Sequence, residues 1–575
     1  MATQFHKVLK ALSCAALFLA GALSLGQMDA QGNPIDQSPY LTVCSEMQAS
    51  WVRNFNPFLP VNTSRWSATA AIYEPLFIYN RLTGEFVPWL GLEQRYEDDR
   101  HLALLVKIRS GVLWSDGKVF TPKDVAFTFN LLKKFPATDL YGIGTFLDHV
   151  EVASPDTVRF VYKKPYAPGF SYLAHQPIVP EHIWSLVKDP VAFANENPVG
   201  TGPFTQVSLF QPQVYQMDRN PNYWQPGKPA VKGLRFPAFP SNEQVMLALL
   251  KGQLDLAGNF VPAIDRIYVA KDPEHNKYWH PLIGSMVNLY LNTTEAPFND
   301  AAVRKALSQA IDREKIVKIA MFNHSVPGHP TGLSDSFAKW RLQGDLPEGA
   351  WAHYDPQAAE KALDALGFKK GPDGKRRLPS GEKWTFDVNV VSGWSDWVRA
   401  AMIIVKSFHA LGIDAKMKTM DFAAWYDKIQ RGEFNSSIAW SLDTTDPFLY
   451  YRWLMSKETV LPVGQMSANN WHRFSDPEAD RLLTDLGQTF DEERQKVLVQ
   501  DLQRVFMDRA PVIPLFPNPS WGEAHTARFV GFSSKDNPYA ALTPNYIPEV
   551  LQVLTTIEPR VKVAQKSQQP VERGG

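Results

Sequence analysis

The chain has 575 residues, which corresponds to three or four compact units at about 150 residues per domain. Its 59 Lys and Arg residues balance 59 Asp and Glu residues, and this zero net charge argues against nucleic acid or an anionic lipid surface as the main partner. Hydrophobic residues make up 45% and charged residues 21%, a composition that excludes a mostly disordered chain.

The N-terminus has the pattern of a secretory signal. Lys7 and Lys10 precede an uncharged apolar run at residues 11–25, which is shorter than the roughly 20 residues that span a bilayer as a helix. Small residues follow at 20–26 and provide cleavage sites. We therefore expect residues 1–26 to be a signal peptide, cut between residues 22 and 30, and the mature protein to be periplasmic or extracellular. A lipidated Cys14 is the alternative, but the apolar stretch before it is short.

Predicted strands and helices alternate along the chain, which indicates an α/β or α+β protein. Apolar side chains alternate over residues 102–108 and 158–162, as in strands with one buried face. Helices should begin where a capping side chain directly precedes proline. Such starts occur at Thr121, Asp355 and Asp476.

A long amphipathic helix is predicted from about Ala301 to Phe322. Pro- and Gly-rich segments near residues 197–204 and 293–299 predict joints between domains. Residues 558–575 are polar and aperiodic, so we expect a disordered tail there.

The sequence contains none of the common catalytic motifs. Phosphate-binding loops, zinc helices, nucleophile elbows and calcium loops are all absent. His324 and His329 lie in one loop without a third ligand type nearby, and the proximity of Asp443 to Asp446 in sequence does not establish a glycosidase pair. We therefore expect a protein that is not an enzyme, with no catalytic residue, no cofactor and no metal.

Residues 111–127, GVLWSDGKVFTPKDVAF, resemble the signature of family 5 extracellular solute-binding proteins, the peptide and oligosaccharide receptors of ABC importers. Further matching segments follow in the expected order over about residues 40–555. They are Tyr73–Phe77, Asn197–Phe204, Asn220–Trp224, Val303–Asp312 and Pro511–Phe516.

The resemblance implies a fold like the type II periplasmic binding proteins, with two lobes that close on a ligand about a hinge and an extra inserted domain. In this sequence, lobe I would be discontinuous and would comprise residues 31–77, 200–291 and 526–557. The inserted domain II would be residues 78–199, and lobe II, the third domain, would be residues 292–525. The joints expected near residues 197–204 and 293–299 fall at two boundaries of this division: the one between domain II and lobe I, and the one between lobe I and lobe II. Within the signature, Trp114 is expected to pack and Ser115–Gly117 to form a turn.

The same resemblance suggests a peptide ligand. In the oligopeptide and dipeptide receptors of the family, a W-x-x-D segment places its Asp against the α-ammonium group of the peptide. Asp443 matches that position after Trp440, and the backbone of Ser441 and Leu442 would run beside the ligand like an added strand. The alternative is that Asp443 caps a helix or satisfies a turn, although Asp446 directly precedes Pro447 and is the stronger cap candidate.

A second set of residues suggests a sugar. Residues 393–397, GWSDW, resemble the cellobiose-binding branch of the family, as do residues 194–197. Indole rings stack on the apolar face of a pyranose, so Trp394 and Trp397 are candidate ligand contacts. Trp51, Asn54 and Trp453 are further candidates for the wall of the site. Each Trp is equally compatible with the core, and Asp443 tips the balance slightly towards short peptides.

Three classes of function remain for comparison. A binding receptor explains export, neutral charge, missing catalytic motifs and the full-length resemblance. A secreted hydrolase requires a carboxylate pair or triad that assembles only on folding, and a chaperone or sensor requires a partner other than a permease. We expect a monomeric receptor that closes on a peptide or oligosaccharide and docks on a membrane permease, whose ATPase subunits are separate chains.

Overall fold

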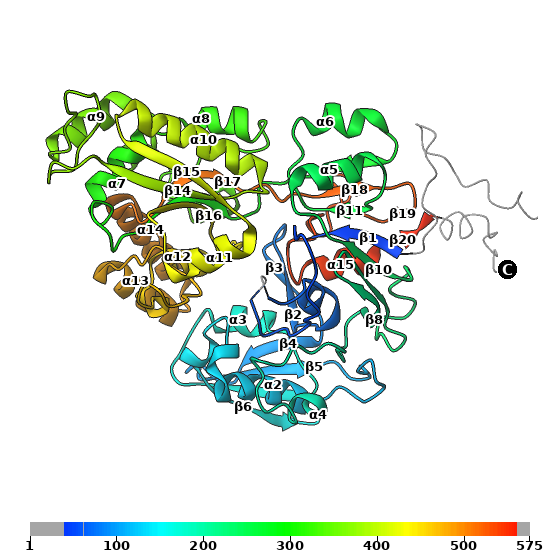
Figure 1. Ribbon diagram of the computed structural model, residues 1–575. Coiled ribbons are helices and arrows are strands. Elements are labelled where there is room, and N and C mark those ends of the chain that lie inside the picture. Colours follow the sequence, from blue (N-terminus) through cyan, green and yellow to red (C-terminus); the bar gives the residue numbers. More distant parts are fainter. Residues whose placement is uncertain (1–39, 46, 61–62, 561–575) are drawn as a thin grey trace, which may run out of the picture.

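The computed structural model describes residues 40–45, 47–60 and 63–560 (Figure 1). The predicted signal peptide at residues 1–26 lies outside the described residues, as does the predicted tail beyond residue 560. The three larger of the five sheets organise the described chain, and each forms the centre of a body with its own helices.

The seven-stranded body is built on a mixed sheet that gathers strands from distant parts of the chain. Strand β1 lies inside this sheet and pairs in parallel with β10 on one side and β11 on the other. The strand order is β12 (Asn276–Tyr278), β18 (Glu523–His525), β11 (Leu256–Ala257), β1 (Tyr40–Cys44), β10 (Gly233–Pro237), β9 (Val214–Arg219) and β8 (Phe204–Gln211). The associated shorter elements are η1 (Ala68–Ile72), α5 (Asn242–Leu250), α6 (Ile264–Ile267), η4 (Val269–Lys271), α15 (Val550–Thr556) and the pair β19 (Phe529–Val530) and β20 (Glu558–Pro559).

The five-stranded body is one continuous segment, residues 286–517. Its sheet order is β15 (Asp414–Met420), β14 (Thr385–Val391), β16 (Ser436–Trp440), β13 (Met286–Leu291) and β17 (Ile513–Pro517). Strand β14 is parallel to both neighbours, whereas β13 is antiparallel to both of its own. The helices are α7 (Ala301–Gln309), α8 (Arg313–Lys315), η5 (Ile316–Ala320), η6 (Asp335–Phe337), η7 (Pro347–Ala352), α9 (Pro356–Ala365), α10 (Ser395–Ala410), α11 (Phe422–Arg431), α12 (Pro447–Met455), η8 (Lys457–Thr459), α13 (Pro477–Gln488) and α14 (Glu492–Arg509).

The four-stranded body is an antiparallel sheet in the order β4 (Gly91–Tyr96), β5 (Ala103–Ile108), β7 (Thr157–Tyr162) and β6 (Leu147–Ser154). The hairpin β2 (Phe77–Asn80) and β3 (Glu85–Pro88) precedes it, and α2 (Pro122–Lys134), η2 (Pro136–Thr138), η3 (Ile143–Thr145), α3 (Gly169–His175) and α4 (Glu181–Trp184) accompany it. It also contacts the five-stranded body, because the Ala167 N–H donates to the Gly487 carbonyl at 2.8 Å and His101 stacks on Phe490 at 3.8 Å.

Two chain segments join the seven-stranded body to the five-stranded body, within the part of the chain that the structure describes. They are residues 279–285, between β12 and β13, and residues 518–522, between β17 and β18. The segments run together, because the Asn518 N–H donates to the Ser285 carbonyl at 2.6 Å and the Ser520 N–H to the Pro281 carbonyl at 3.0 Å. A paired connection of this kind suits a hinge, which needs few residues to change conformation.

The three helix starts expected from the sequence are observed. Thr121 and Asp124 form a reciprocal capping box at α2, and Asp355 and Asp476 cap α9 and α13 through their side chains. Trp114 is fully buried, and the Gly117 N–H closes a turn on the Trp114 carbonyl at 2.8 Å. These local signals are reliable because capping satisfies backbone N–H groups that a helix leaves unpaired.

The prediction of one long helix from Ala301 to Phe322 is wrong. Helix α7 ends at Gln309, and Asp312 begins a new turn by accepting the Lys315 N–H at 2.9 Å. The chain then continues as the π-helical turn η5. A capping Asp in the middle of an amphipathic pattern offers the backbone a second start, and here that start replaces continuation.

The predicted ends of two segments also differ from the structure. Glu558 pairs with Val530 in the ladder of β19 and β20, so residues 558–560 are ordered although the tail was expected to begin there. Strand β18 belongs to the seven-stranded sheet, although it falls within the range expected for lobe II. The division of the chain into domains stays a prediction.

Candidate functional site

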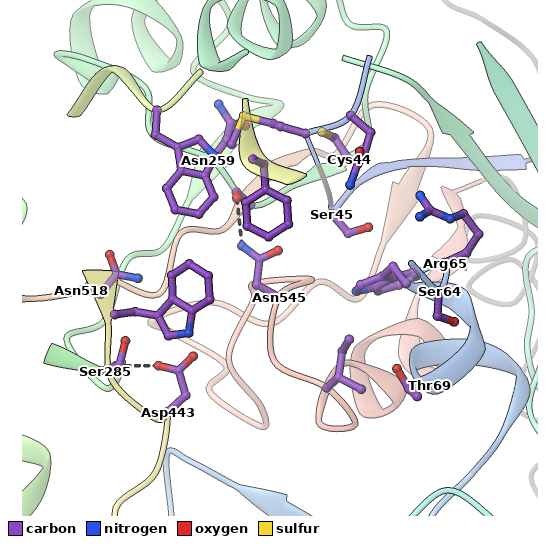
Figure 2. A pocket seen from close by; sticks show the side chains of 18 of the residues that line it. Cys44, Ser45, Ser64, Arg65, Thr69, Asn259, Ser285, Asp443, Asn518 and Asn545 are labelled. Carbon is purple, nitrogen blue, oxygen red and sulfur yellow. Dashed lines mark hydrogen bonds between the residues drawn. The ribbon is translucent and has the colours of Figure 1, made fainter. Parts of the chain in front are cut away.

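A cavity of about 310 Å³ lies between the seven-stranded and five-stranded bodies. The seven-stranded side contributes Cys44 and Ser45 at the end of β1, Asn259 after β11 and Asn545 before α15 (Figure 2). The five-stranded body and the joining segments contribute Ser285, Trp394, Trp397, Phe422, Trp440, Asp443 and Asn518.

A second cavity of about 370 Å³ adjoins the first. The residues that line both are Leu59, Thr69, Trp440, Asp443, Asn545 and Ile547. The second cavity extends towards the four-stranded body and α12, and includes Arg81, Tyr172, Leu442, Arg452 and Trp453 among its walls. Asp443 therefore stands at the junction of two chambers, which together form one cleft between the bodies.

The Asp443 side chain is fixed by one of the joining segments. Its Oδ1 atom accepts a hydrogen bond from the Ser285 N–H at 2.5 Å, which Figure 2 shows beside the cavity. The side chain is half-buried, and the surface that it keeps faces the two chambers. Burial raises the pKa of the Asp443 carboxyl group, although the charge of Arg81 and the hydrogen bond from Ser285 both act to lower it.

Arg81 does not neutralise Asp443 directly. Its guanidinium pairs with the buried carboxylate of Glu549 at 3.0 Å and lies over the Tyr546 ring at 4.4 Å. Asp443 forms no ion pair with any residue in the described part of the chain. A carboxylate that is partly desolvated and lacks a cationic partner gains most from a ligand that brings a positive charge.

The two acidic residues after β16 have separate roles. Asp446 caps α12, because its Oδ1 accepts the Phe448 N–H at 2.8 Å, and burial raises its pKa to about 6. The backbone N–H of Asp446 is in turn held by the Thr444 hydroxyl at 3.0 Å. Asp443 therefore does not cap α12, since Asp446 takes that position. Its bond to the Ser285 N–H gives Asp443 a structural contact, and its place in the ligand site stays a prediction.

Aromatic rings form the wall of the first chamber on the five-stranded side. Trp394 and Trp397 meet edge to face at 4.7 Å, and Trp394 stacks on Phe422 at 5.6 Å. Trp440 stacks in turn on Tyr426 at 5.8 Å. Trp397 is buried in the core, whereas Trp394, Phe422 and Trp440 each keep a partly exposed face. Such faces can accept an apolar side chain, a sugar ring or a cation.

The segment at Ser441 and Leu442 differs from the added-strand interpretation. The Ser441 N–H donates to the Met286 carbonyl at 2.9 Å, and the fully buried Ser441 hydroxyl bonds to the same backbone. This N–H is therefore not available to a ligand, although Ser441 and Leu442 both line the second chamber.

The remaining predicted residues lie in different places. Trp453 lines the second chamber and meets Trp471 edge to face at 5.2 Å. Trp51 and Asn54 line neither chamber. Trp51 is buried, and its indole N–H donates to the Phe236 carbonyl at 2.9 Å, while the Asn54 side chain accepts the Asn56 N–H at 3.1 Å.

The sequence reasoning missed the carboxamides of the cleft. Asn259, Asn518 and Asn545 come from three loops that the fold brings together, and the Asn545 side chain donates to the Gly258 carbonyl at 3.0 Å (Figure 2). No local motif marks these residues, so only the assembled sheets reveal them. Among the described residues, no group of three or more His, Cys, Asp and Glu side chains is arranged to hold a metal ion.

Comparison with known proteins identifies the family. The model for "Bacterial extracellular solute-binding proteins, family 5 Middle" matches residues 85–460. The chain belongs to this family. Its members are binding proteins rather than enzymes, so the expectation of a solute-binding receptor of family 5 is confirmed.

Individual relatives agree over most of the chain. The probable D,D-dipeptide-binding periplasmic protein DdpA of Escherichia coli (strain K12) is 24% identical over 483 residues, which cover 81% of this chain and 86% of that protein. The oligopeptide-binding protein AppA of Bacillus subtilis (strain 168) is 26% identical over 438 residues, 73% of this chain and 77% of the relative.

The fold matches solved structures of the same group. The mannohexaose-bound periplasmic oligopeptide-binding protein of an oligopeptide ABC transporter from Thermotoga maritima superposes with a TM-score of 0.82 at 26% identity, covering 92% of this chain and 99% of that chain. The expected fold, an α/β binding protein with two lobes and an extra domain, is confirmed. Within the described residues, no helix of this solute-binding protein combines the length and apolar character needed to cross a membrane.

Proposed function

We propose that this solute-binding protein captures a short peptide in the cleft and anchors its α-ammonium group on Asp443. The observation that carries the proposal is a half-buried carboxylate at the junction of two chambers, held by the Ser285 N–H and without a cationic partner among the described residues. An ammonium group supplies the missing charge and N–H donors together, and charge-assisted hydrogen bonds of this kind are about twice as strong as neutral ones.

The residues that line the two chambers suggest which end of a bound peptide lies in each. The first chamber presents the partly exposed rings of Trp394, Phe422 and Trp440, which suit an apolar or aromatic side chain. Arginines line both chambers, with Arg65 in the first and Arg81 and the buried Arg452 in the second. We expect a peptide with its ammonium group at Asp443 to point its first side chain towards the rings of the first chamber and its carboxyl end towards the two arginines of the second.

An oligosaccharide is the second candidate, and one specific feature favours it. Trp394 and Phe422 lie nearly parallel, with an interplanar angle of 30°, beside the carboxamides of Asn518 and Asn545. Rings and amides in this combination suit pyranose faces and hydroxyl groups. The Thermotoga maritima structure contains mannohexaose, which shows that a relative with this fold accepts a sugar. Asp443 has no comparable task in a neutral sugar site.

The receptor's wider role follows from its class. We propose that the chain is exported by its N-terminal signal, works as a monomer outside the cytoplasm and delivers its ligand to an ABC permease. The ATPase subunits are separate chains, because the sequence contains no nucleotide-binding motif. Closure traps the ligand because binding favours the closed form by its differential affinity for that form.

A thermal-shift screen tests the ligand class. The purified protein is heated with short peptides and, in parallel, with β-linked oligosaccharides. A ligand specific for the folded state stabilises it by about 2.7 kcal/mol at a hundredfold excess over Kd. We expect shifts with peptides. Shifts with oligosaccharides alone would assign the aromatic wall to sugar stacking and refute the peptide proposal.

A further inference from the structure

Helices α5 and α10 belong to different bodies, and their first residues meet. Val245 and Leu249 of α5 are buried together with Cys44 in the core of the seven-stranded body, whereas Trp397 and Ile404 of α10 are buried in the core of the five-stranded body. Figure 1 shows the two helices on opposite sides of the boundary between these bodies. The contact between their N-termini therefore bridges the cleft.

Hydrogen bonds connect the two N-termini through Asn242. Its backbone N–H donates to the Gly393 carbonyl at 3.0 Å, and its side-chain amide donates to Asp396 Oδ1 at 3.3 Å. The same amide lies 3.5 Å from the Ser395 hydroxyl. Asn242 and Asp396 are only 3% and 4% exposed, so these bonds are shielded from water. Removing one partner of a buried polar contact is costly, because the other partner is then left without a hydrogen bond.

Gly393 makes the approach possible. A Cβ atom at this position would lie 2.6 Å from the Pro240 carbonyl oxygen and 3.4 Å from the Ser241 Cα atom, both in the seven-stranded body. Real Cβ atoms do not come that close to a backbone oxygen. The backbone of Gly393 is not in the left-handed region, so alanine is compatible with the local conformation and conflicts only with the opposite body.

The contact is adjacent to the ligand cleft. Trp394 directly follows Gly393, and its ring forms part of the first chamber's wall. Because the two bodies are joined by residues 279–285 and 518–522, opening about these segments separates α5 from α10 and moves the Trp394 wall away from Asn259 and Asn545. Such an opening would break the contact between the two N-termini.

We propose that Asn242 and the turn from Gly393 to Asp396 form a latch that holds the two bodies closed and positions Trp394 over the cleft. The latch goes beyond the proposed function, and it requires only that the cleft opens and closes, not that the ligand is a peptide. Its residues act on the ligand through Trp394 and are positioning residues.

Three substitutions weaken the latch by different means. Gly393→Ala inserts a methyl group against the Pro240 carbonyl and acts as a wedge. Asn242→Pro removes the N–H that donates to Gly393, at the first position of α5, where proline suits a helix. Asn242→Ala removes only the side-chain bonds. Ser392→Ala and Glu243→Ala are matched controls, because these neighbouring side chains are exposed.

Cys44 reports the state of the cleft without any ligand. Its buried thiol lines the first chamber, and Cys14 is the only other cysteine in the sequence. In the mature protein, which lacks Cys14 once the signal peptide is removed, or in a Cys14→Ser background of the uncleaved chain, the rate of alkylation by N-ethylmaleimide measures how often the cleft opens. We expect Gly393→Ala and Asn242→Pro to raise this rate by about fivefold to tenfold, since one hydrogen bond contributes about 1 kcal/mol. Asn242→Ala should give a smaller increase and the controls none.

Melting temperature decides between a latch and ordinary packing. A latch predicts faster alkylation with a melting temperature close to that of the parent protein, because each body keeps its own core. Unchanged alkylation in the proline and wedge variants would overturn the proposal. A loss of folding that accompanies the faster alkylation would also overturn it, because the contact would then be part of the core. Neither result depends on which ligand the thermal-shift screen finds.

Discussion

The carboxylate of Asp443 accepts a hydrogen bond from the backbone N–H of Ser285, which lies in one of the two segments that join the bodies around the cleft. The proposed ligand anchor is thus bonded directly to the connection about which the bodies would move. The Ser285 carbonyl is in turn paired with Asn518 of the other joining segment at 2.6 Å. A charge placed at Asp443 is therefore close to both segments that join the two bodies.

Substitution of two tryptophans distinguishes a residue of the cleft wall from a residue of the core. Trp394→Ala removes part of the cleft wall, so we expect peptide affinity to fall by about tenfold with little change in melting temperature. Trp51→Ala should do the opposite, because Trp51 is buried away from both chambers, and a loss of about 3–5 kcal/mol of stability is typical of such truncations. Calorimetric titration and thermal unfolding of both variants measure the two effects. Equal effects on affinity would place Trp51 in the site.

Ligand should protect Cys44 from alkylation. The thiol lies in the first chamber, so a peptide held there covers it and keeps the cleft closed. In the Cys14→Ser background, a peptide at a hundred times its Kd should slow alkylation at least tenfold, since the ligand-free fraction is then about one hundredth. A peptide that binds without slowing the reaction would have to occupy another surface, and the cleft would not be its site.

The stability of the fold should fall between about pH 4.5 and pH 7 because of Glu74. This fully buried carboxyl accepts hydrogen bonds from Trp89 at 2.6 Å and Tyr223 at 3.0 Å, and burial raises its pKa from 4.5 to about 7. A raised carboxyl pKa means that the folded protein binds the proton more tightly than the unfolded chain. The stabilisation is complete below pH 4.5 and is lost as the pH rises through 7, by up to about 3 kcal/mol.

Glu74→Gln isolates this effect. The amide remains neutral at every pH, so the decrease in unfolding free energy between pH 4.5 and pH 7 should be smaller in the variant than in the parent protein. The part that remains comes from other buried carboxyl groups such as Asp446. Urea denaturation at several pH values measures the difference. The same slope in both proteins would mean that Glu74 does not titrate in this range.

Local parts of the fold were predictable from sequence, and assembled parts were not. The helix starts at Thr121, Asp355 and Asp476 depend on side chains within three residues of the cap, so the sequence contains the whole signal. The interruption after Gln309 was missed because the apolar pattern continues across it, and only the cap at Asp312 ends the helix. Strands β1 and β18 lie in the same sheet, although most of the sequence separates them.

The candidate site likewise combines residues that short motifs predicted with residues that only the assembled fold brings together. Asp443, Trp394 and Trp440 were predicted from short motifs and lie on the cleft. The facing carboxamides Asn259 and Asn545 were missed, because they meet Asp443 only after two bodies close around the cavity. Trp51 was proposed as a further wall residue without a motif of its own, and its burial against Phe236 reflects how often an indole ring serves the core.

Calorimetric titration of one peptide and its N-acetylated form, on the parent protein and on Asp443→Asn, tests the central claim most directly. Asp485→Asn is the control, since Asp485 is a surface carboxylate paired with Arg481. If Asp443 binds the ammonium group, acetylation and Asp443→Asn should each weaken binding by about tenfold to a hundredfold, and the two losses should not add, because both remove the same contact. Equal affinity for the free and acetylated peptides would contradict the account and leave the cleft to a neutral ligand.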